Sequence, residues 1–545
     1  MQSGVNPGRR PIAFDERKID TIFAELNQCH LPGAAVGIAI HGRPVYRKGF
    51  GLANLELPVV LSPTTRMRIA SVSKHFASLA FMLLCEEGKA RPDDHVGVHI
   101  PELHTVTRDV TMRQLMGNIG GLRDSHDVSC QFGGSTRPVS SLELLSFYRT
   151  MGDVNAAPGA TWIYNNGGFL ILSTAIERIC GQTLEDVLRE RIFEPVGMYS
   201  TQLRRWDTDF VSDSAVAHMT TDSGGYTRSN FWGMAWAGEG GIVSTIDDML
   251  RWLAHMDSPV VGSDQTWATM RSPQILANGT STGYGLGLVC GQYRGAHAVY
   301  HLGGGMGCSA YMVKIPAAGL DVVVMANRED AQAASLGEQI LDACLPDLDP
   351  VEPTDAHRLQ TGVFRSRVSG RVLELRVSPF EVRPWIKKGQ PVACIDGRDI
   401  PVAADKDGVL RPTGSWRHFK LSIAFFAERA DPPGIRISDF GNVDDLQLVR
   451  TECRPDDETI LGSYRSSITD IQATITAVRS GPQLCTFTRF GTATFELQCL
   501  ADRIWRAKPT GPIPWGGGVL VFDDEGTGFR FWSNRTRALI FQRNA

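Results

Sequence analysis

The spacing of apolar residues changes several times in the first part of the chain and predicts short strands alternating with longer helices. Residues 34–40 form a run of small apolar side chains, His41 and Gly42 follow, and residues 44–50 return, which is typical of a β-hairpin. Residues 71–87 begin with a serine and end before a glycine, and their apolar side chains recur at helical spacing, at Phe76, Leu79, Ala80, Leu83 and Leu84. This pattern predicts an amphipathic helix.

Two more helices and three more strands are predicted before residue 345. Residues 168–180 and 184–192 have helical spacing, and they end at a glycine and before a proline, which are stop signals. Three later runs are apolar and rich in β-branched residues, at positions 298–301, 309–315 and 321–327. We therefore expect an α+β fold for this part of the chain.

The rest of the chain consists of short apolar runs separated by turn residues, which predicts two antiparallel β-sandwiches or barrels. The predicted strands are residues 373–377, 390–395, 419–426, 468–478, 484–490, 494–500, 518–522, 528–532 and 538–541. Segments rich in proline and charge, at residues 346–355 and 450–458, cannot continue a helix or a central strand. We expect three domains, at residues 1–345, 356–450 and 456–545.

Composition narrows the class of protein without naming a function. Of the 545 residues, 42% are hydrophobic and 21% are charged, which describes a globular protein rather than a disordered one. A net charge of -4 offers no electrostatic attraction for nucleic acid. The first residues lack the apolar core of a signal peptide, and no apolar stretch is long enough to span a membrane. We therefore expect a cytoplasmic protein that binds neither nucleic acid nor membrane.

Cysteines and histidines give no sign of a metal site or a disulfide scaffold. The eleven cysteines are scattered and contain no Cys-x-x-Cys pair, so we expect mostly reduced thiols. His95 and His99 stand four residues apart, but prolines flank their segment and no His-Glu-x-x-His motif is present. We expect no bound metal.

Ser71 and Lys74 stand three residues apart at the start of the first predicted helix. On a helix this spacing puts both side chains on one face, about 5–6 Å apart at Cβ. A serine hydroxyl is a poor nucleophile without an adjacent base, and a lysine whose pKa is lowered by burial can accept its proton. The two residues are therefore candidates for a catalytic pair.

Two further motifs stand at a predicted turn and at a predicted strand end. Tyr164 and Asn166 lie just before a predicted helix, where cationic neighbours would lower the phenol pKa from about 10 and allow proton relay. His301 ends a strand pattern and is followed closely by Gly303 and Gly304. Glycines there would let a substrate approach the strand, and a backbone N–H could stabilise an oxyanion.

The order Ser-x-x-Lys, Tyr-x-Asn and His-x-Gly resembles the serine β-lactamase and penicillin-binding protein family, and within it the class C β-lactamase branch. The resemblance covers nearly all of residues 1–345. It implies a β-lactamase/DD-peptidase-like catalytic domain, in which an antiparallel sheet is flanked by helices and joined by a helical subdomain. It also implies a serine hydrolase that works through an acyl-enzyme on Ser71.

A chain of this family that continues into two β-rich domains is similar to the D-stereospecific aminopeptidases. That resemblance implies two antiparallel β-barrels after the catalytic domain and a loop of the last barrel that reaches the active site. We expect this loop near residues 489–494, with Arg489 and Thr494 as substrate-binding residues. An aminopeptidase also needs a carboxylate for the substrate ammonium, and Glu496 and Glu239 are the candidates. Because the expected loop carries an arginine, an N-blocked or carboxylate-bearing substrate is the alternative.

The same resemblance implies roles for the motif residues. Ser71 attacks the scissile carbonyl, and Lys74 and Tyr164 share the base role in an order that the sequence leaves open. Tyr164 returns the proton to the leaving amine with help from His301. Asn166 orients Lys74 or binds the substrate amide. The reaction needs no metal and no organic cofactor.

Three functions stay open. The first is a D-aminopeptidase that releases N-terminal D-amino acids from short peptides or amides. The second keeps the chemistry but acts as an esterase, a D-amino acid amidase, a DD-carboxypeptidase or a β-lactamase. The third is a catalytically idle peptide-binding protein. The expected partner is a small peptide or amide substrate, and a homodimer fits these interpretations, although the sequence does not choose an oligomeric state.

Overall fold

The computed structural model describes residues 12–134, 137–221, 223–229, 233–350, 360–379, 386–414, 420–426, 433–449, 452–454, 458–510 and 517–544. The end of the first predicted linker and part of the second therefore lie outside the described residues.

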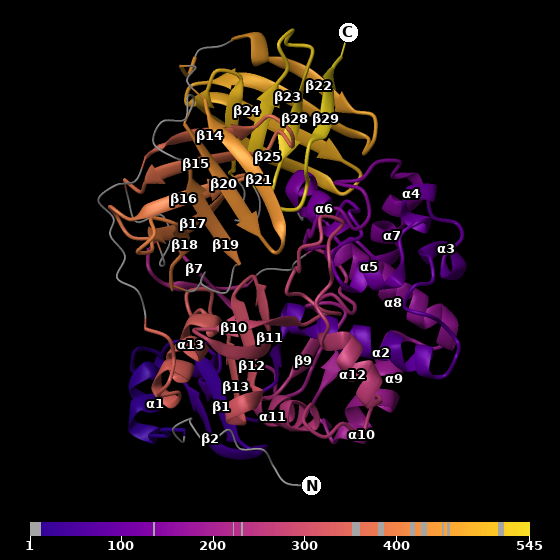
Figure 1. Cartoon of the computed structure of the whole chain (residues 1–545), viewed down its shortest axis with the longest axis vertical. Coiled ribbons are helices and arrows are strands. Elements are labelled where there is room, and N and C mark those ends of the chain that lie inside the picture. The colour runs from indigo at the N-terminus through magenta and orange to yellow at the C-terminus, as the bar shows by residue number, and fades with distance from the viewer. Residues whose placement is uncertain are drawn as a thin grey trace.

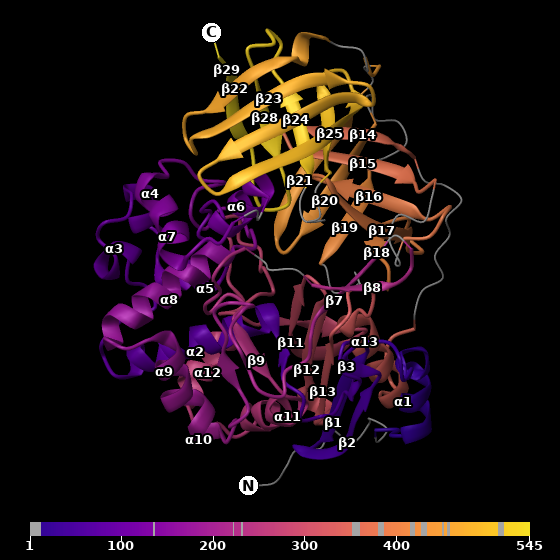
Figure 2. The ribbon, with the colours of Figure 1, turned by 180° about the vertical axis from the view of Figure 1, so that it is seen from behind.

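The first domain is built on a six-stranded antiparallel sheet of order β10-β11-β12-β13-β1-β2, as Figure 1 and Figure 2 show. Its strands are β1 (Ala34–Ile40), β2 (Arg43–Phe50), β10 (Val289–Tyr293), β11 (Ala296–Gly305), β12 (Cys308–Ile315) and β13 (Leu320–Ala326). The predicted hairpin at β1 and β2 is confirmed, and the three later predicted strands are β11, β12 and β13. Ala34 lies opposite Ala326, so the beginning and the end of the domain share one part of the sheet.

Helices cover both faces of this sheet, because its central strands are apolar on both sides. The helical elements of the domain are α1 (Glu16–Ile22), η1 (Ala24–Leu26), η2 (Ala70–Ser73), α2 (Lys74–Glu86), α3 (Val96–His99), α4 (Thr105–Arg108), α5 (Met112–Met116), α6 (Ser125–Gly133), α7 (Ser141–Thr150), α8 (Asn166–Cys180), α9 (Leu184–Leu188), η3 (Arg189–Phe193), α10 (Glu194–Val196), α11 (Ile246–His255), α12 (Asp264–Arg271), η4 (Pro316–Ala318) and α13 (Ala333–Cys344). α1 and α13 share one hydrophobic core with the sheet, through residues such as Ile19 and Ile340. α11 packs on the other face, where a Cβ on Gly37 would lie 2.5 Å from a methyl of Ile246.

The predicted helices form, with differences at their ends. The helix expected from residue 71 opens with the 3-10 turn η2 before α2, and the helix expected at 168–180 is α8. The helix expected at 184–192 is divided between α9 and the π-helical η3, and α10 follows at residue 194. Short strands complete the domain: β3 (Leu52–Asn54), β4 (Val59–Val60), β5 (Met67–Arg68), β6 (Gln202–Leu203), β7 (His218–Thr220), β8 (Tyr226–Arg228) and β9 (Ile242–Ser244).

Two closed antiparallel barrels follow, each with eight strands in sequential order, so the predicted fold class is confirmed. The second domain contains β14 (Gly362–Ser366), β15 (Val372–Val377), β16 (Pro391–Ile395), β17 (Arg398–Ala404), β18 (Leu410–Pro412), β19 (Leu421–Phe425), β20 (Gly434–Asp439) and β21 (Asn442–Leu448). The third contains β22 (Gly462–Ser466), β23 (Ile471–Val478), β24 (Gly481–Thr488), β25 (Gly491–Ala501), β26 (Ile504–Pro509), β27 (Gly518–Phe522), β28 (Gly528–Trp532) and β29 (Leu539–Arg543), after the short helix η6 (Glu458–Ile460). The domain boundaries at residues 345, 356, 450 and 456 stay a prediction.

Both barrels contact the first domain (Figure 1). In the second domain, the Phe440 ring stacks on Trp162 with a centroid distance of 3.9 Å, and Asn442 exchanges hydrogen bonds with the Trp162 backbone. In the third domain, Phe531 and Phe541 pack against Phe132 of α6 at 4.9 and 5.9 Å. The two contacts flank the segment that leads to Tyr164.

The region expected to form a long loop at residues 489–494 is different in the structure. β24 ends at Thr488 and β25 begins at Gly491, so the turn holds only Arg489 and Phe490. The predicted extent of the loop is wrong, because the β-branched residues after Gly491 continue the strand and a tight turn suffices.

One disulfide is present that the sequence did not indicate. Cys453 and Cys499 form it across 46 residues, and no other disulfide is recorded among the described cysteines. The prediction of mostly reduced thiols missed this pair because a distant pairing leaves no short motif.

Membrane-spanning helices and metal-binding clusters are both absent from the described residues. In the described parts of the chain, no helix is long and apolar enough to cross a membrane. No group of three or more His, Cys, Asp or Glu residues there is arranged to hold a metal ion.

Candidate active site

Ser71 lies in a tight turn that the sheet holds in place. It belongs to η2, directly before α2, and the preceding Ala70 has a positive φ of 46°. Such a conformation costs about 1–3 kcal/mol in a residue other than glycine, so the surroundings must impose it. β11 supplies the constraint: a Cβ on Gly303 would lie 2.0 Å from the Ile69 carbonyl oxygen. Gly303 therefore allows the strand to press against the serine turn.

Lys74 is fully buried beside Ser71 and is held by three oxygen atoms. Its Nζ lies 2.7 Å from Asn166 Oδ1, 2.6 Å from the Glu239 carbonyl oxygen and 3.3 Å from Ser71 Oγ. Burial lowers the pKa of Lys74 well below its usual range, the charge of Arg535 lowers it further, and the carboxylate of Glu239 opposes the shift. The amine is therefore biased toward its neutral form.

The three contacts of Lys74 fit a neutral amine. A neutral amine has two N–H donors and one lone pair, whereas an ammonium has three donors. The Asn166 and Glu239 oxygens at the shorter distances accept the two N–H bonds. The remaining contact is the Ser71 hydroxyl, which can donate to the lone pair. This geometry prepares Lys74 to remove the serine proton.

Tyr164 lies beside Ser71, between the side chains of Lys74 and Arg535. Lys74 Nζ lies 4.6 Å and the Arg535 guanidinium 5.0 Å from the centre of its ring. Burial raises the pKa of Tyr164 above its usual value, although a hydrogen bond with Ser71 and the charge of Arg535 act in the opposite direction. The condition that the sequence set for proton relay, a lowered phenol pKa, is not met, because burial outweighs the charge of Arg535. A phenol in this state keeps its proton and can donate it.

Asn166 owes its position to the start of α8. Asn165 caps the helix by accepting the Gly168 N–H through its side chain, and Asn166 is the first helical residue. The Asn166 backbone N–H donates to Asp124 Oδ2 at 3.0 Å. The side chain is thereby directed at Lys74, as the first of the two predicted roles requires.

His301 is buried next to Tyr164, with a ring-centroid distance of 6.5 Å, and both its ring nitrogens are engaged. Nδ1 lies 2.7 Å from the Leu302 carbonyl oxygen, which can only accept, so Nδ1 carries the proton. Nε2 then accepts from the Tyr284 hydroxyl at 3.1 Å. Burial and the charge of Lys74 lower the pKa of His301 to about 3, so the ring is neutral. These contacts fit a residue that positions its neighbours rather than one that donates a proton.

Gly304 lies on an open edge of β11. β10 pairs with β11 only as far as Tyr300, and beyond that point the ladder recorded for β11 is with β12. A Cβ on Gly304 would meet no atom within 4 Å, which marks free space beside the strand. A substrate backbone could lie along this edge, close to the Ser71 turn.

Glu239 lies inside the site, next to Lys74. Its side chain is fully buried, accepts the Ala237 N–H at 2.7 Å and lies 3.3 Å from His126 Nε2. Burial alone would raise the pKa of Glu239, but the hydrogen bond and charge of His126 outweigh it and lower the pKa. Its contribution to the site is the backbone carbonyl that holds Lys74.

The three predicted residues of the third domain lie elsewhere. The Arg489 carbonyl accepts hydrogen bonds from Arg137 at 2.6 and 3.1 Å, beside α6. Thr494 is a strand residue whose carbonyl accepts from Thr510. Glu496 points outward from the barrel, opposite Lys508. The described contacts connect none of the three with Ser71.

A different segment of the third domain contacts the site. Residues 533–537, which we call the Arg535 loop, join β28 and β29. Arg535 lies over Tyr164 and 3.6 Å from Asp124 Oδ2. The sequence contained a signal for this loop, because both flanking strands were predicted and an arginine stands between them.

Comparisons with known proteins agree with this geometry. Residues 19–345 match the Beta-lactamase family. A D-aminopeptidase of Brucella canis is 29% identical over 333 residues, which cover 60% of this chain and 61% of the relative. The chain thus matches only about three fifths of that relative's length.

Two solved structures share the fold. The octameric penicillin-binding protein homologue from Pyrococcus abyssi has a TM-score of 0.57 at 22% identity, covering 80% of this chain and 100% of that one. The D-amino acid amidase from Ochrobactrum anthropi SV3 has a TM-score of 0.51 at 20% identity, covering 60% and 97%.

Proposed function

Because the chain belongs to the Beta-lactamase family, we propose that it is a D-stereospecific serine hydrolase that releases N-terminal D-amino acids from short peptides or amides through an acyl-enzyme on Ser71. The observation that carries the proposal is the environment of Lys74, whose two closest acceptors leave its lone pair to Ser71. The D-aminopeptidase and D-amino acid amidase relatives support the choice of substrate.

The reaction begins with proton transfer from Ser71 Oγ to neutral Lys74 Nζ as Oγ attacks the scissile carbonyl. The backbone N–H groups of Ser71 and Gly304 hold the oxyanion, since both lie where β11 meets the serine turn. This order assigns the base role to Lys74, which the sequence left open.

Collapse of the tetrahedral intermediate needs a proton for the leaving amine. Tyr164 supplies it, because its raised pKa keeps the phenol protonated and Ser71 lies within hydrogen-bonding reach. Lys74 then returns the serine proton to Tyr164, which restores both groups. Water cleaves the acyl-enzyme by the reverse path. His301 positions Tyr284 and the end of β11 rather than moving a proton.

Two measurements test the proposal. Incubation with a fluorophosphonate followed by mass spectrometry should place one adduct on Ser71, and Ser71→Ala should abolish it. D-alanine 4-nitroanilide should be hydrolysed at least tenfold faster than its L-isomer if the site selects D-residues by about 1.4 kcal/mol or more. Equal rates for the two isomers would refute the stereospecificity, while retained turnover in Ser71→Ala would refute the nucleophile.

An esterase, a DD-carboxypeptidase or a β-lactamase would use the same residues, and the 4-nitroanilide comparison separates them from the aminopeptidase. The cytoplasmic location and the homodimer stay predictions from the sequence.

A further inference from the structure

The Arg535 loop is held firmly against the first domain. Ser533 and Thr536 donate to one oxygen of Asp127 in α6, at 3.1 and 2.7 Å. Asn155 donates to the Arg535 carbonyl at 2.7 Å and accepts the Arg537 N–H at 2.9 Å. Four hydrogen bonds on both sides of Arg535 fix the place from which its side chain extends.

The guanidinium of Arg535 is at the site and reachable from it. It lies 5.0 Å from the centre of the Tyr164 ring, and its side chain is 22% exposed. The guanidinium forms an ion pair with Asp124 Oδ2 at 3.6 Å, a distance longer than a hydrogen bond. The oxygens of Asp124 accept the backbone N–H groups of three residues instead, namely His126, Asn166 and Gly167. A guanidinium has five N–H donors in a fork that suits a carboxylate.

A second cation strengthens the positive potential. Burial and the charge of Arg535 lower the pKa of Arg398 to about 10, so the two guanidinium groups act on each other. Arg398 lies at the start of β17 in the second domain, whereas Arg535 belongs to the third. Two barrels therefore direct positive charge at one place.

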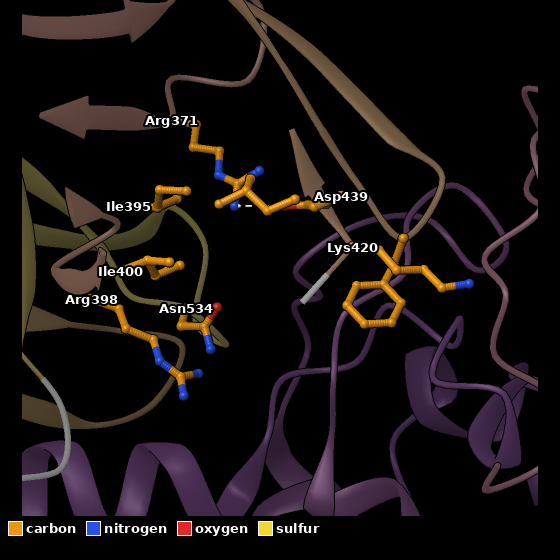
Figure 3. Close-up of a pocket in the computed structure, with 9 residues that line it drawn as sticks. Arg371, Ile395, Arg398, Ile400, Lys420, Asp439 and Asn534 are labelled. Carbon is orange, nitrogen blue, oxygen red and sulfur yellow. Dashed lines mark ion pairs between the residues drawn. The ribbon is translucent and has the colours of Figure 1, made fainter. Parts of the chain in front are cut away.

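A cavity between the second and third domains shares this character. Asn534 of the Arg535 loop lines it together with Arg371, Arg398, Lys420 and Asp439 (Figure 3). Arg371 pairs with Asp396 and Asp439 at 2.8 and 3.0 Å. In the wall of this cavity, three cationic side chains accompany one carboxylate.

The cavity and the catalytic residues are connected by aromatic rings. Phe440, which lines the cavity, stacks on Trp162, and the Trp162 ring lies 6.2 Å from Tyr164. On the other side, Asn534 in the cavity wall is the neighbour of Arg535, which covers Tyr164. A substrate group next to Tyr164 would therefore lie close to Arg535.

We infer that Arg535 selects substrates that carry a carboxylate in the part that lies next to Tyr164. This deepens the proposed function, on which it rests: the leaving group contributes an anion, and Arg535 binds it by charge-assisted hydrogen bonds. A free ammonium at the same place would face Arg535 and be repelled. Arg535 is a specificity-determining residue that the barrel of the third domain brings to a site whose reacting groups all belong to the first domain.

The test compares two substrates that differ by one carboxylate, D-alanine 4-nitroanilide and D-alanine 3-carboxy-4-nitroanilide. The wild-type kcat/KM should be roughly tenfold or more higher for the carboxylated compound, as expected for a hydrogen bond to a charged group. Arg535→Gln should bring the ratio near one, and Arg535→Lys should keep part of it. Arg530→Gln is the matched control, because Arg530 is an exposed residue of β28 and its loss changes net charge equally.

The result that overturns the inference is a wild-type ratio of one or less, or a ratio that Arg535→Gln leaves unchanged. Fluorophosphonate labelling of Ser71 in each variant shows that the site is intact. If neither anilide reacts, the proposed D-activity fails by itself, and the esters phenyl acetate and 3-carboxyphenyl acetate test the carboxylate preference through the rate of Ser71 acylation. Equal acylation by the two esters in the wild type would then reject the role of Arg535.

Discussion

The two sides of Tyr164 are built in different ways. On the Lys74 side, the three oxygens around Nζ all come from the first domain, and the two closest contacts, with Asn166 and Glu239, are buried. On the Arg535 side, a loop of the third domain contributes a partly exposed charge, and its neighbour Arg398 comes from the second. The comparison separates reaction from selection: one side activates Ser71 for any substrate, and the other discriminates among substrates.

The largest expected effect comes from breaking the buried side. Lys74→Met keeps the volume of the side chain but removes the base, so kcat/KM should fall by about 10²- to 10⁴-fold. The loss should be the same for carboxylated and uncarboxylated anilides, which initial-rate kinetics will show. A loss confined to one of the two substrates would contradict the separation of roles, and thermal unfolding of the variant checks that the fold persists.

Tyr164→Phe should have the next largest effect, and it should depend on the leaving group. An anilide or amide needs a proton on its departing nitrogen, whereas a phenolate does not, so amide turnover should fall by about 10²-fold and ester turnover much less. The comparison uses D-alanine 4-nitroanilide and phenyl acetate. Equal losses on both would show that Tyr164 acts before the leaving group departs.

The pH dependence links the two sides. Lys74 must be neutral to act, and because burial lowers its pKa, the acidic limb of kcat/KM should lie well below the usual lysine range. Arg535 contributes to this lowering, so Arg535→Gln should raise the pKa of Lys74 and move the limb to higher pH. A pH profile of each variant measures the limb directly. A limb that moves to lower pH would contradict the assigned sign.

The smallest effect is expected from the aromatic contact of the second domain. Phe440→Leu removes the stack on Trp162, and such a pair contributes about 0.5–1.5 kcal/mol beyond its buried area. Thermal unfolding should record a modest loss of stability, while the ratio of carboxylated to uncarboxylated turnover should stay near the wild-type value. A large change in that ratio would mean that the second domain also selects substrates.

Local patterns were enough to predict much of the catalytic half of the site. Ser71 and Lys74 were recognisable because one turn of helix brings them together, and Tyr164 and Asn166 because they precede a helix with clear periodicity. Gly303 and Gly304 were recognisable as a strand end that a backbone could approach. The direction of the Tyr164 pKa shift was not readable from the sequence, because burial depends on side chains far along the chain, and no local pattern reports it.

The sequence predicted the strands of the third domain well, but it did not predict which of its hairpins contacts the active site. Both strands around the Arg535 loop were expected, yet the loop at residues 489–494 was chosen instead. The Arg489 carbonyl accepts a hydrogen bond from Arg137 beside α6, whereas the Arg535 guanidinium lies over the Tyr164 ring. Which hairpin of a closed barrel faces the first domain depends on how the barrel docks, and all its hairpins look alike in sequence.

The amino-acid order alone therefore predicted the family, the α+β fold of the first domain and the two β-rich modules, and it supplied the candidates for the reacting residues. These features follow from spacings of a few residues, which helices and strands convert directly into geometry. The charge that faces the substrate was settled by the packing of three domains. Arg535 follows Ser71 by 464 positions in the sequence, and hydrogen bonds with Asp127, Asn155 and Arg123 hold its loop beside Tyr164.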